Sequence, residues 1–310
     1  MRIAIVGQQK FGKAVYEAFL NRGDAVAGVF CAPDRPGAAN DPLKAAAEAG
    51  AVPVFQLDSL RGERARTILR GLQVDLAVMA YVLQFVPQDF TAIPAYGTIQ
   101  YHPSLLPRHR GPSAVNWPII LGESETGLSI FRPTDGLDEG PVILQKKVSI
   151  GPDETLGQLY FERLFPLGVE ALMEASRLVL ASAAPALPQD PSAASYEGWC
   201  RAPEARINWH DHGDRIYNLI RGCDPVPGAW THYKGEKLQL FEAQKRPVRS
   251  FAQIAGVAGS IGAISDSGMS VNTHGAQIEI RRVRFKDGAK QSAQDFCREQ
   301  GVAVGELLDY

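Results

Sequence analysis

The amino-acid sequence predicts an α/β protein, in which a doubly wound, mostly parallel sheet is followed by a smaller, β-rich and barrel-like domain. Through the first half of the chain, short apolar runs typical of buried strands alternate with amphipathic stretches typical of helices. Repeated β-α-β units of this kind imply parallel strands joined by right-handed crossovers. In the last third of the chain, turn residues separate short alternating runs, which favour antiparallel strands.

The expected elements of the first half follow in order. Strands are expected at residues 2–6, 25–31, 52–55, 76–80, 98–101, 127–131 and 142–150. Helices are expected at residues 11–22, 41–50, 58–72 and 112–121, and from 153 toward 181. The second of these helices has the clearest start, because Asp41 can serve as its N-cap and Pro42 is favoured at the first helical position.

The regular alternation stops at residues 181–197, which are rich in proline and small residues and carry little charge. Such a composition indicates a linker between domains. We therefore expect a first domain at 1–182, a linker at 183–198 and a second domain at 199–310. Strands are expected in the second domain at residues 238–241, 262–264, 269–272 and 277–285.

The composition is that of an ordinary globular protein, with 45% hydrophobic and 21% charged residues among 310. A net charge of −2 argues against a strong electrostatic footprint for nucleic acid. The four cysteines are far apart in sequence and contain no Cys-x-x-Cys pair, so reduced, unconnected thiols are expected. No apolar run approaches the ~18 residues of a membrane span, and we expect a cytoplasmic protein.

The richest chemistry lies in the loop of residues 100–111, which follows an expected strand and precedes an expected helix. The carboxyl ends of strands in an open α/β sheet are where such folds place ligands. Its prolines restrict the backbone and suit a stiff loop that aims His102 for proton transfer. A second segment, Thr134-Asp-Gly-Leu-Asp-Glu-Gly140, reads as a tight turn that presents Asp138. A carboxylate beside a histidine favours the imidazolium and fixes its tautomer.

Taken together, these two segments resemble the folate-dependent formyltransferase family. The match is closest to the amino-terminal hydrolase domain of 10-formyltetrahydrofolate dehydrogenase, and it thins after about residue 245. It rests on His102-Pro-Ser-Leu-Leu-Pro-Arg-His-Arg-Gly111 with the later Leu137-Asp-Glu-Gly140, and extends to Gln84-Phe-Val-Pro87, Ala114-Val-Asn-Trp117, Ala205-Arg-Ile-Asn-Trp209, Ile220-Arg-Gly222 and Pro227-Gly-Ala-Trp230. The resemblance implies a Rossmann-like domain that uses 10-formyltetrahydrofolate as formyl donor, with no metal and no nucleotide.

By the same resemblance, His102 is the catalytic proton shuttle and Asp138 orients it, whereas Asp135 matches no catalytic position. Attack by water, giving tetrahydrofolate and formate, is the leading reaction. Gln84, Phe85 and Val86 match the segment that lines the pterin pocket, although Phe85 and Val86 are also typical of a core after a strand. Ser104 either contacts substrate or caps a turn. Arg108 and Arg110 are weaker candidates for the folate tail, since exposed arginines are usually only solvated.

Gln100 departs from the family pattern. Most members carry asparagine two residues before the histidine, and the closest relatives usually carry an aliphatic residue there. A glutamine keeps the amide donor but places it one methylene further out. Gln100 either donates to the oxyanion or only packs, and the sequence favours neither reading.

Several alternatives stay open. Methionyl-tRNA formyltransferases share the chemistry but carry a basic insertion after the second strand. The corresponding residues here, 34–41, form a short segment without a lysine cluster, so tRNA is not expected as a partner. Transfer to an amino sugar is a further option, and a folate-binding module without activity is the non-enzymatic one. The oligomeric state is not indicated.

Three other patterns are weaker. Gly7-Gln-Gln-Lys-Phe-Gly-Lys-Ala14 nearly spells a phosphate loop, but Ala14 lacks the hydroxyl that binds magnesium, so a tight turn is expected. His210, Asp211 and His212 form a polar turn with no further ligand cluster nearby in sequence. Ser113 and the cysteines lack the context of a nucleophile elbow.

Overall fold

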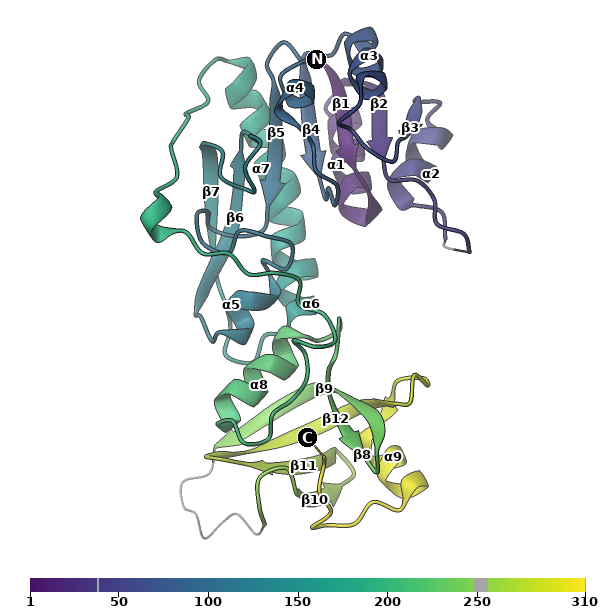
Figure 1. Ribbon diagram of the computed structural model, residues 1–310, viewed down its shortest axis with the longest axis vertical. Helices are drawn as coiled ribbons and strands as arrows, with labels where there is room; N and C mark the ends of the chain where they lie inside the picture. Colours follow the sequence, from purple (N-terminus) through teal and green to yellow (C-terminus); the bar gives the residue numbers. More distant parts are fainter. Residues whose placement is uncertain (38, 248–255, 310) are drawn as a thin grey trace. The chain divides into compact units, whose positions relative to one another are not determined.

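The computed structural model describes residues 1–37, 39–247 and 256–309, shown as a ribbon in Figure 1. The chain forms two compact units. The first holds Met1–Ala114, Gly127–Val148 and Phe161–Glu197, and the second holds Val115–Thr126, Ser149–Tyr160 and Gly198–Tyr310. Two stretches inside the expected first domain therefore pack with the second unit. Trp117 and Ile120 explain one of them, because they lie against the second unit's apolar core.

The first unit contains a seven-stranded sheet with the order β3-β2-β1-β4-β5-β6-β7. The strands are β1 (Arg2–Gly7), β2 (Ala25–Cys31), β3 (Val54–Gln56), β4 (Leu76–Ala80), β5 (Thr98–His102), β6 (Glu125–Phe131) and β7 (Val142–Ser149). From β3 to β5 the neighbours are parallel, whereas β6 runs antiparallel to β5. The predicted doubly wound, mostly parallel sheet is confirmed.

The helices before residue 181 lie mostly in the first unit, whereas those at residues 116–120 and 156–158 lie in the second. They are α1 (Gln9–Asn21), α2 (Pro42–Ala49), α3 (Glu63–Leu72), α4 (Gln88–Thr91), α5 (Asn116–Ile120), α6 (Leu156–Gln158), the π-helical η1 (Leu159–Leu164) and α7 (Phe165–Leu180). The Asp41 carboxylate caps α2, as predicted, by accepting from the N–H groups of Leu43 and Lys44. The expected helix starts at 58, 112 and 153 are wrong by several residues. The last of these helices begins instead at a capping box formed by Thr155 and Gln158.

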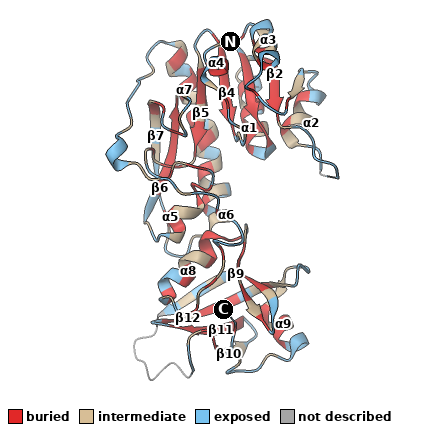
Figure 2. Ribbon diagram, in the orientation of Figure 1, coloured by how far each residue is buried: buried red, intermediate tan, exposed pale blue. Residues whose placement is uncertain are grey.

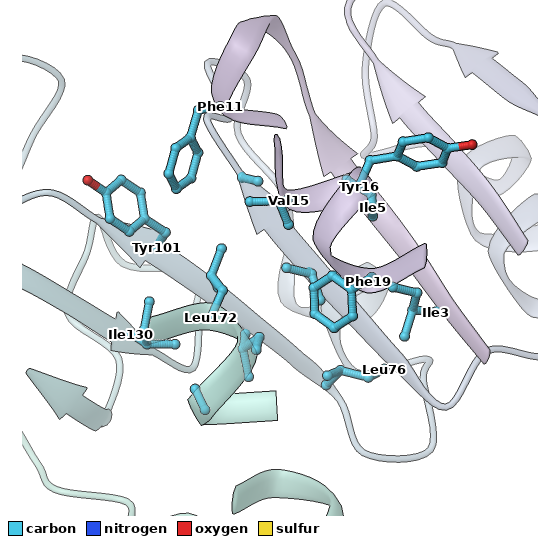
Figure 3. Close-up of a cluster of buried hydrophobic side chains, with 14 of the residues drawn as sticks. Ile3, Ile5, Phe11, Val15, Tyr16, Phe19, Leu76, Tyr101, Ile130 and Leu172 are labelled. Atoms are coloured by element: carbon cyan, nitrogen blue, oxygen red, sulfur yellow. The ribbon is translucent and has the colours of Figure 1, made fainter. Parts of the chain in front are cut away.

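A large apolar core lies between this sheet and helices α1 and α7. Figure 3 shows side chains of β1, β4 and β5, among them Ile3, Leu76 and Tyr101, beside Phe11 of α1 and Leu172 of α7. The Phe11 and Tyr101 ring centroids are 4.4 Å apart. Figure 2 shows that the central strands of the sheet, such as β1 and β4, are mostly buried. Because side chains alternate along a strand, the residues of β5 on either side of Tyr101 face the other side of the sheet.

The second unit contains a six-stranded sheet whose main order is β10-β11-β12-β9-β8, with β13 paired to β12. Its strands are β8 (Ala229–Tyr233), β9 (Glu236–Pro247), β10 (Ile261–Ser265), β11 (Gly268–Thr273), β12 (Ala276–Phe285) and β13 (Gln291–Ser292), and all the pairings along it are antiparallel. The predicted β-rich domain is confirmed. Three helical elements also follow α7, namely η2 (Pro191–Ala193) in the first unit, and α8 (Gly213–Gly222) and α9 (Ala293–Gln300) in the second.

All four cysteines are free and buried. Burial raises the pKa of Cys31 and of Cys297 to about 11, which keeps both as thiols at neutral pH. Cys200 and Cys223 are nevertheless brought together, with their Sγ atoms 3.8 Å apart, which the sequence did not indicate. Over the part of the chain that the structure describes, no helix is long and apolar enough to cross a membrane.

Candidate active site

His102 is the last residue of β5, at the carboxyl end of a central strand. The residue is only 5% exposed. Its Nε2 atom lies 2.8 Å from the carbonyl oxygen of His109. A carbonyl oxygen can only accept, so Nε2 carries a hydrogen and donates it. In the neutral ring, Nδ1 is therefore the basic nitrogen.

Asp138 lies beside that basic nitrogen. Its Oδ2 atom is 3.6 Å from His102 Nδ1, an ion-pair distance rather than a hydrogen bond. The same oxygen accepts a hydrogen bond of 3.0 Å from the N–H of Gly111. Asp138 is 9% exposed and adopts a φ of +52°. Protonation of Nδ1 would place the new N–H next to this carboxylate, so the structure brings the two expected residues together in a suitable arrangement.

Ser104 is fully buried in the turn of the loop. Its hydroxyl donates to the carbonyl oxygen of Arg108 at 2.6 Å, and its own carbonyl accepts from the Ser129 hydroxyl at 2.7 Å. This is the turn-capping contact that the sequence analysis considered. A contact between Ser104 and a substrate stays a prediction.

Gln100 shares its face of β5 with His102, because the two are separated by one residue. It lies opposite Phe131 of β6 and Met79 of β4. Its side chain is half-buried, and its amide has no hydrogen-bond partner among the residues that the structure describes. The amide is therefore available for a ligand, which leaves both readings of Gln100 open.

The segment Gln84–Val86 follows β4, the parallel neighbour of β5, so both strands end at the same edge of the sheet. Val86 is buried, whereas Phe85 is 43% exposed with the Arg61 guanidinium 4.5 Å from its ring centroid. Gln84 Oε1 is buried and finds no donor within the described ranges 1–37, 39–247 and 256–309. A buried acceptor without a partner costs about 1–3 kcal/mol, which a ligand N–H could offset. This supports the predicted pocket.

Two other charged residues considered in the sequence analysis, Asp135 and Arg110, form hydrogen bonds within the protein. Asp135 is exposed, and its Oδ1 accepts from the N–H of Gln88 at the start of α4 at 2.8 Å. The Arg110 guanidinium donates twice to the Gln189 side-chain oxygen, at 2.8 and 3.2 Å. Arg110 is thus held within the protein, and its contact with a folate tail stays a prediction, as does that of Arg108.

The near phosphate loop is a packed turn. A Cβ at Gly7 would lie 1.9 Å from the carbonyl oxygen of Ala80, so the turn needs glycine to approach β4. The N–H of Gln9 donates to the Asp41 carboxylate at 2.8 Å. His212 caps α8 through its Nδ1, which accepts from the N–H of Asp214. In the described part of the chain, no group of three or more His, Cys, Asp or Glu side chains is placed to hold a metal.

Gln189 and Glu197 are the contacts that the sequence analysis missed. Gln189 Nε2 donates to the carbonyl oxygen of Asp138 at 2.7 Å, and Glu197 Oε2 lies 3.1 Å from His109 Nδ1. Both belong to the expected linker. No sequence pattern points to them, because they lie among prolines and small residues and their partners are 51 and 88 positions away.

Comparison with known proteins gives two family matches. The formyl transferase model matches residues 1–175, and the formyl transferase C-terminal domain model matches residues 201–301. The human mitochondrial 10-formyltetrahydrofolate dehydrogenase is 36% identical over 99% of this chain, which spans about a third (34%) of that protein. The methionyl-tRNA formyltransferase of Syntrophus aciditrophicus (strain SB) is 32% identical, over 99% of this chain and 98% of that protein.

Among solved structures, HypX from Aquifex aeolicus in complex with tetrahydrofolic acid is similar over all of this chain and 51% of its own, with a TM-score of 0.70. At 18% identity this likeness shows the fold alone.

Proposed function

Because this chain belongs to the folate-dependent formyl transferase family, as its motifs predict, we propose that it cleaves the N10-formyl group of 10-formyltetrahydrofolate with water. The products are tetrahydrofolate and formate. The similarity to a 10-formyltetrahydrofolate dehydrogenase supports this choice of donor and of acceptor. Since the chain spans about a third of that relative, the relative's whole activity is not carried over.

The proposed chemistry follows from the two nitrogens of His102. Nε2–H stays hydrogen-bonded to the His109 carbonyl, so Nδ1 is the nitrogen that takes a proton. It takes this proton from the attacking water, while the oxygen of the water adds to the formyl carbon. The Asp138 carboxylate at 3.6 Å stabilises the imidazolium that forms. Nδ1–H then gives the proton to N10, the C–N10 bond breaks, and formic acid leaves and releases its second proton to solvent as formate. The single observation that carries the proposal is this pairing of one tethered nitrogen with one basic nitrogen beside a carboxylate.

The tetrahedral intermediate also needs a donor for its oxyanion. Gln100 is a candidate, because its amide has no partner among the described residues and lies on the same face of β5 as His102. Backbone N–H groups are the alternative. A transition-state donor of this kind is worth on the order of 100-fold in rate.

The test is to incubate the purified protein with 10-formyltetrahydrofolate and to measure formate and tetrahydrofolate, with and without candidate amines. Formate release at equal rates in both arms is expected. Turnover that needs an amine would replace water by transfer. Binding of folate without turnover in any arm would leave a folate-binding module.

Transfer to methionyl-tRNA is the second candidate. The observation that favours it is the 32% identity to a methionyl-tRNA formyltransferase over nearly the full length of both chains. Against it stands the short segment 34–41, in which Asp34 is occupied by an ion pair with Lys44. Phosphate contacts require available cations, so this segment offers few of them.

A further inference from the structure

Residues 187–197, called the strap from here on, lie along the two loops that carry His102 and Asp138. In Figure 1 the chain leaves α7 and passes beside β7 and β6 before it reaches the second unit. At the beginning of the strap, Leu187 and Val142 of β7 exchange two backbone hydrogen bonds, of 2.8 and 3.0 Å. The strap is therefore docked on the first unit rather than loosely tethered between domains.

Gln189 joins the two loops through one side chain. Its Nε2 donates to the carbonyl oxygens of Asp138 and Gly140, at 2.7 and 2.8 Å. Its Oε1 accepts from Nη2 and Nε of Arg110, at 2.8 and 3.2 Å. Gly140 must be glycine for this arrangement, since a Cβ there would lie 1.7 Å from the Arg132 carbonyl oxygen. All hydrogen-bonding atoms of the Gln189 amide thus face the Asp138 segment or the His102 loop.

The end of the strap holds His109, whose carbonyl oxygen accepts from His102. The Ser195 hydroxyl accepts from the N–H of His109 at 2.9 Å, and Glu197 Oε2 lies 3.1 Å from its Nδ1. His109 is 4% exposed and has a φ of +54°, a backbone conformation that a non-glycine residue adopts only when its surroundings impose it. At Gly111 a Cβ would lie 2.5 Å from the Glu197 carbonyl oxygen, so strap and loop are in close backbone contact.

We propose that the strap is a positioning element of the catalytic site, in which Gln189 fixes the Asp138 segment and Glu197 fixes the carbonyl that orients His102. This inference rests on the proposed function. It makes Gln189 and Glu197 positioning residues, because neither contacts the reacting atoms. Both also act on the tautomer of His102, because Gln189 holds Arg110, the neighbour of His109, and Glu197 holds the His109 side chain. Once the His109 carbonyl is free to move, Nε2 loses its acceptor and Nδ1 is no longer the defined base.

The first test compares Gln189→Ala and Gln189→Glu with Ser192→Ala as the matched control. Ser192 lies in the strap, but its hydroxyl donates only to Asp190, also in the strap. Both Gln189 variants lose the donors to the two carbonyls, so kcat should fall about 10- to 100-fold with KM within about threefold, as for a small misplacement of catalytic groups. Ser192→Ala should keep the wild-type kcat.

Glu197 provides the rescue test. Glu197→Ala removes the acceptor from His109, and kcat should fall about tenfold. Glu197→Gln keeps a side-chain oxygen at the same place and should retain kcat within about threefold. Equal losses in both variants would mean that the charge of Glu197, not its place as an acceptor, is what counts, and would overturn this part of the proposal.

A second measurement does not depend on turnover. The ¹⁵N NMR signals of the His102 ring at neutral pH should show hydrogen on Nε2 in the wild type and in Ser192→Ala. They should show a mixture of tautomers in the Gln189→Ala and Glu197→Ala variants. If the wild type fails to cleave 10-formyltetrahydrofolate, the proposed function is rejected. The change in the His102 tautomer still tests whether the strap positions His102.

The strap proposal is overturned if folded Gln189→Ala keeps kcat within twofold of an active wild type, or if its His102 tautomer is unchanged. Thermal unfolding reports on folding in each variant. If both Gln189 variants fail to fold, the residue is structural and the positioning role is rejected.

Discussion

The loop of residues 102–111 and the strap both hold Asp138, yet they contribute in different ways. The loop carries the histidine that is proposed to move a proton, and it contacts the Asp138 side chain through the Gly111 N–H. The strap contacts Asp138 at its backbone carbonyl, through Gln189. The reactive side chains thus come from the loop and from the Asp138 turn, while the strap supplies contacts that fix their geometry. Substitutions should therefore abolish activity at His102 and Asp138, and attenuate it in the strap.

The largest effect is expected at His102. His102→Ala removes the proposed proton shuttle, so turnover of 10-formyltetrahydrofolate should fall by roughly 100- to 10,000-fold. Folate binding should persist within a few-fold, because the predicted pterin pocket at Gln84–Val86 is formed by a different segment. Turnover and binding are to be measured on one preparation. A variant that retains more than a tenth of wild-type turnover would exclude the shuttle role.

Asp138→Asn should be nearly as damaging. The amide keeps an acceptor for the Gly111 N–H but loses the charge that stabilises the imidazolium. Asp135→Asn is the matched control in the same turn. It keeps an acceptor for the Gln88 N–H, and its exposed carboxylate has no catalytic partner among the described residues, so the loss should be mild. Equal losses at 135 and 138 would show that the turn, rather than the charge, is what the reaction needs.

Gln100 tests whether the strand behind the loop takes part in the chemistry. If its amide donates to the oxyanion, Gln100→Leu should lower kcat by roughly 10- to 1000-fold with little change in folate affinity. We expect this outcome, because the amide has no partner among the described residues and shares the face of His102. Gln100→Asn restores the common family residue and should hold or raise activity. A silent Gln100→Leu would assign the oxyanion to backbone donors.

The loop was predictable from the sequence and the strap was not, for a physical reason. The loop and the Asp138 turn each carry several distinctive residue types within a few positions, so each forms a pattern in the sequence. The strap acts through side chains and backbone groups on partners 51 or 88 positions away in sequence. A contact with a backbone carbonyl does not require a particular residue type at that position, so no sequence pattern indicates it. Its proline-rich composition predicted a linker. The strap does connect the two units along the chain, but that prediction did not include its contacts with the first unit.

The elements of the fold also differ in how well the sequence predicts them. The strands of the first sheet were predicted because apolar runs indicate buried strands directly, whereas β8 was not predicted and helix ends depend on local capping. The start of α3 moved to Glu63 because Gly62, rather than Asp58 or Ser59, is the N-cap. The helix α8 was missed because its cap is His212, a residue type that rarely signals a helix start. For α9 a signal was present in the sequence, since Ser292 is a favoured N-cap residue and its hydroxyl accepts from the Asp295 N–H.

The smallest effect is expected outside both segments, at the surface where a tRNA acceptor would need cations. The net charge is −2, and in residues 34–41 the Asp34 carboxylate is bonded to Lys44 and Gln56. Few phosphate contacts should form, so affinity for methionyl-tRNA should be weak and the slope of log affinity against log salt shallow. Binding measured at several salt concentrations checks this, with formate release as the parallel readout. Efficient formylation of methionyl-tRNA with a steep salt slope would make tRNA the acceptor. It would leave the roles of loop and strap intact, because His102 would take the proton of the attacking amine in place of that of water.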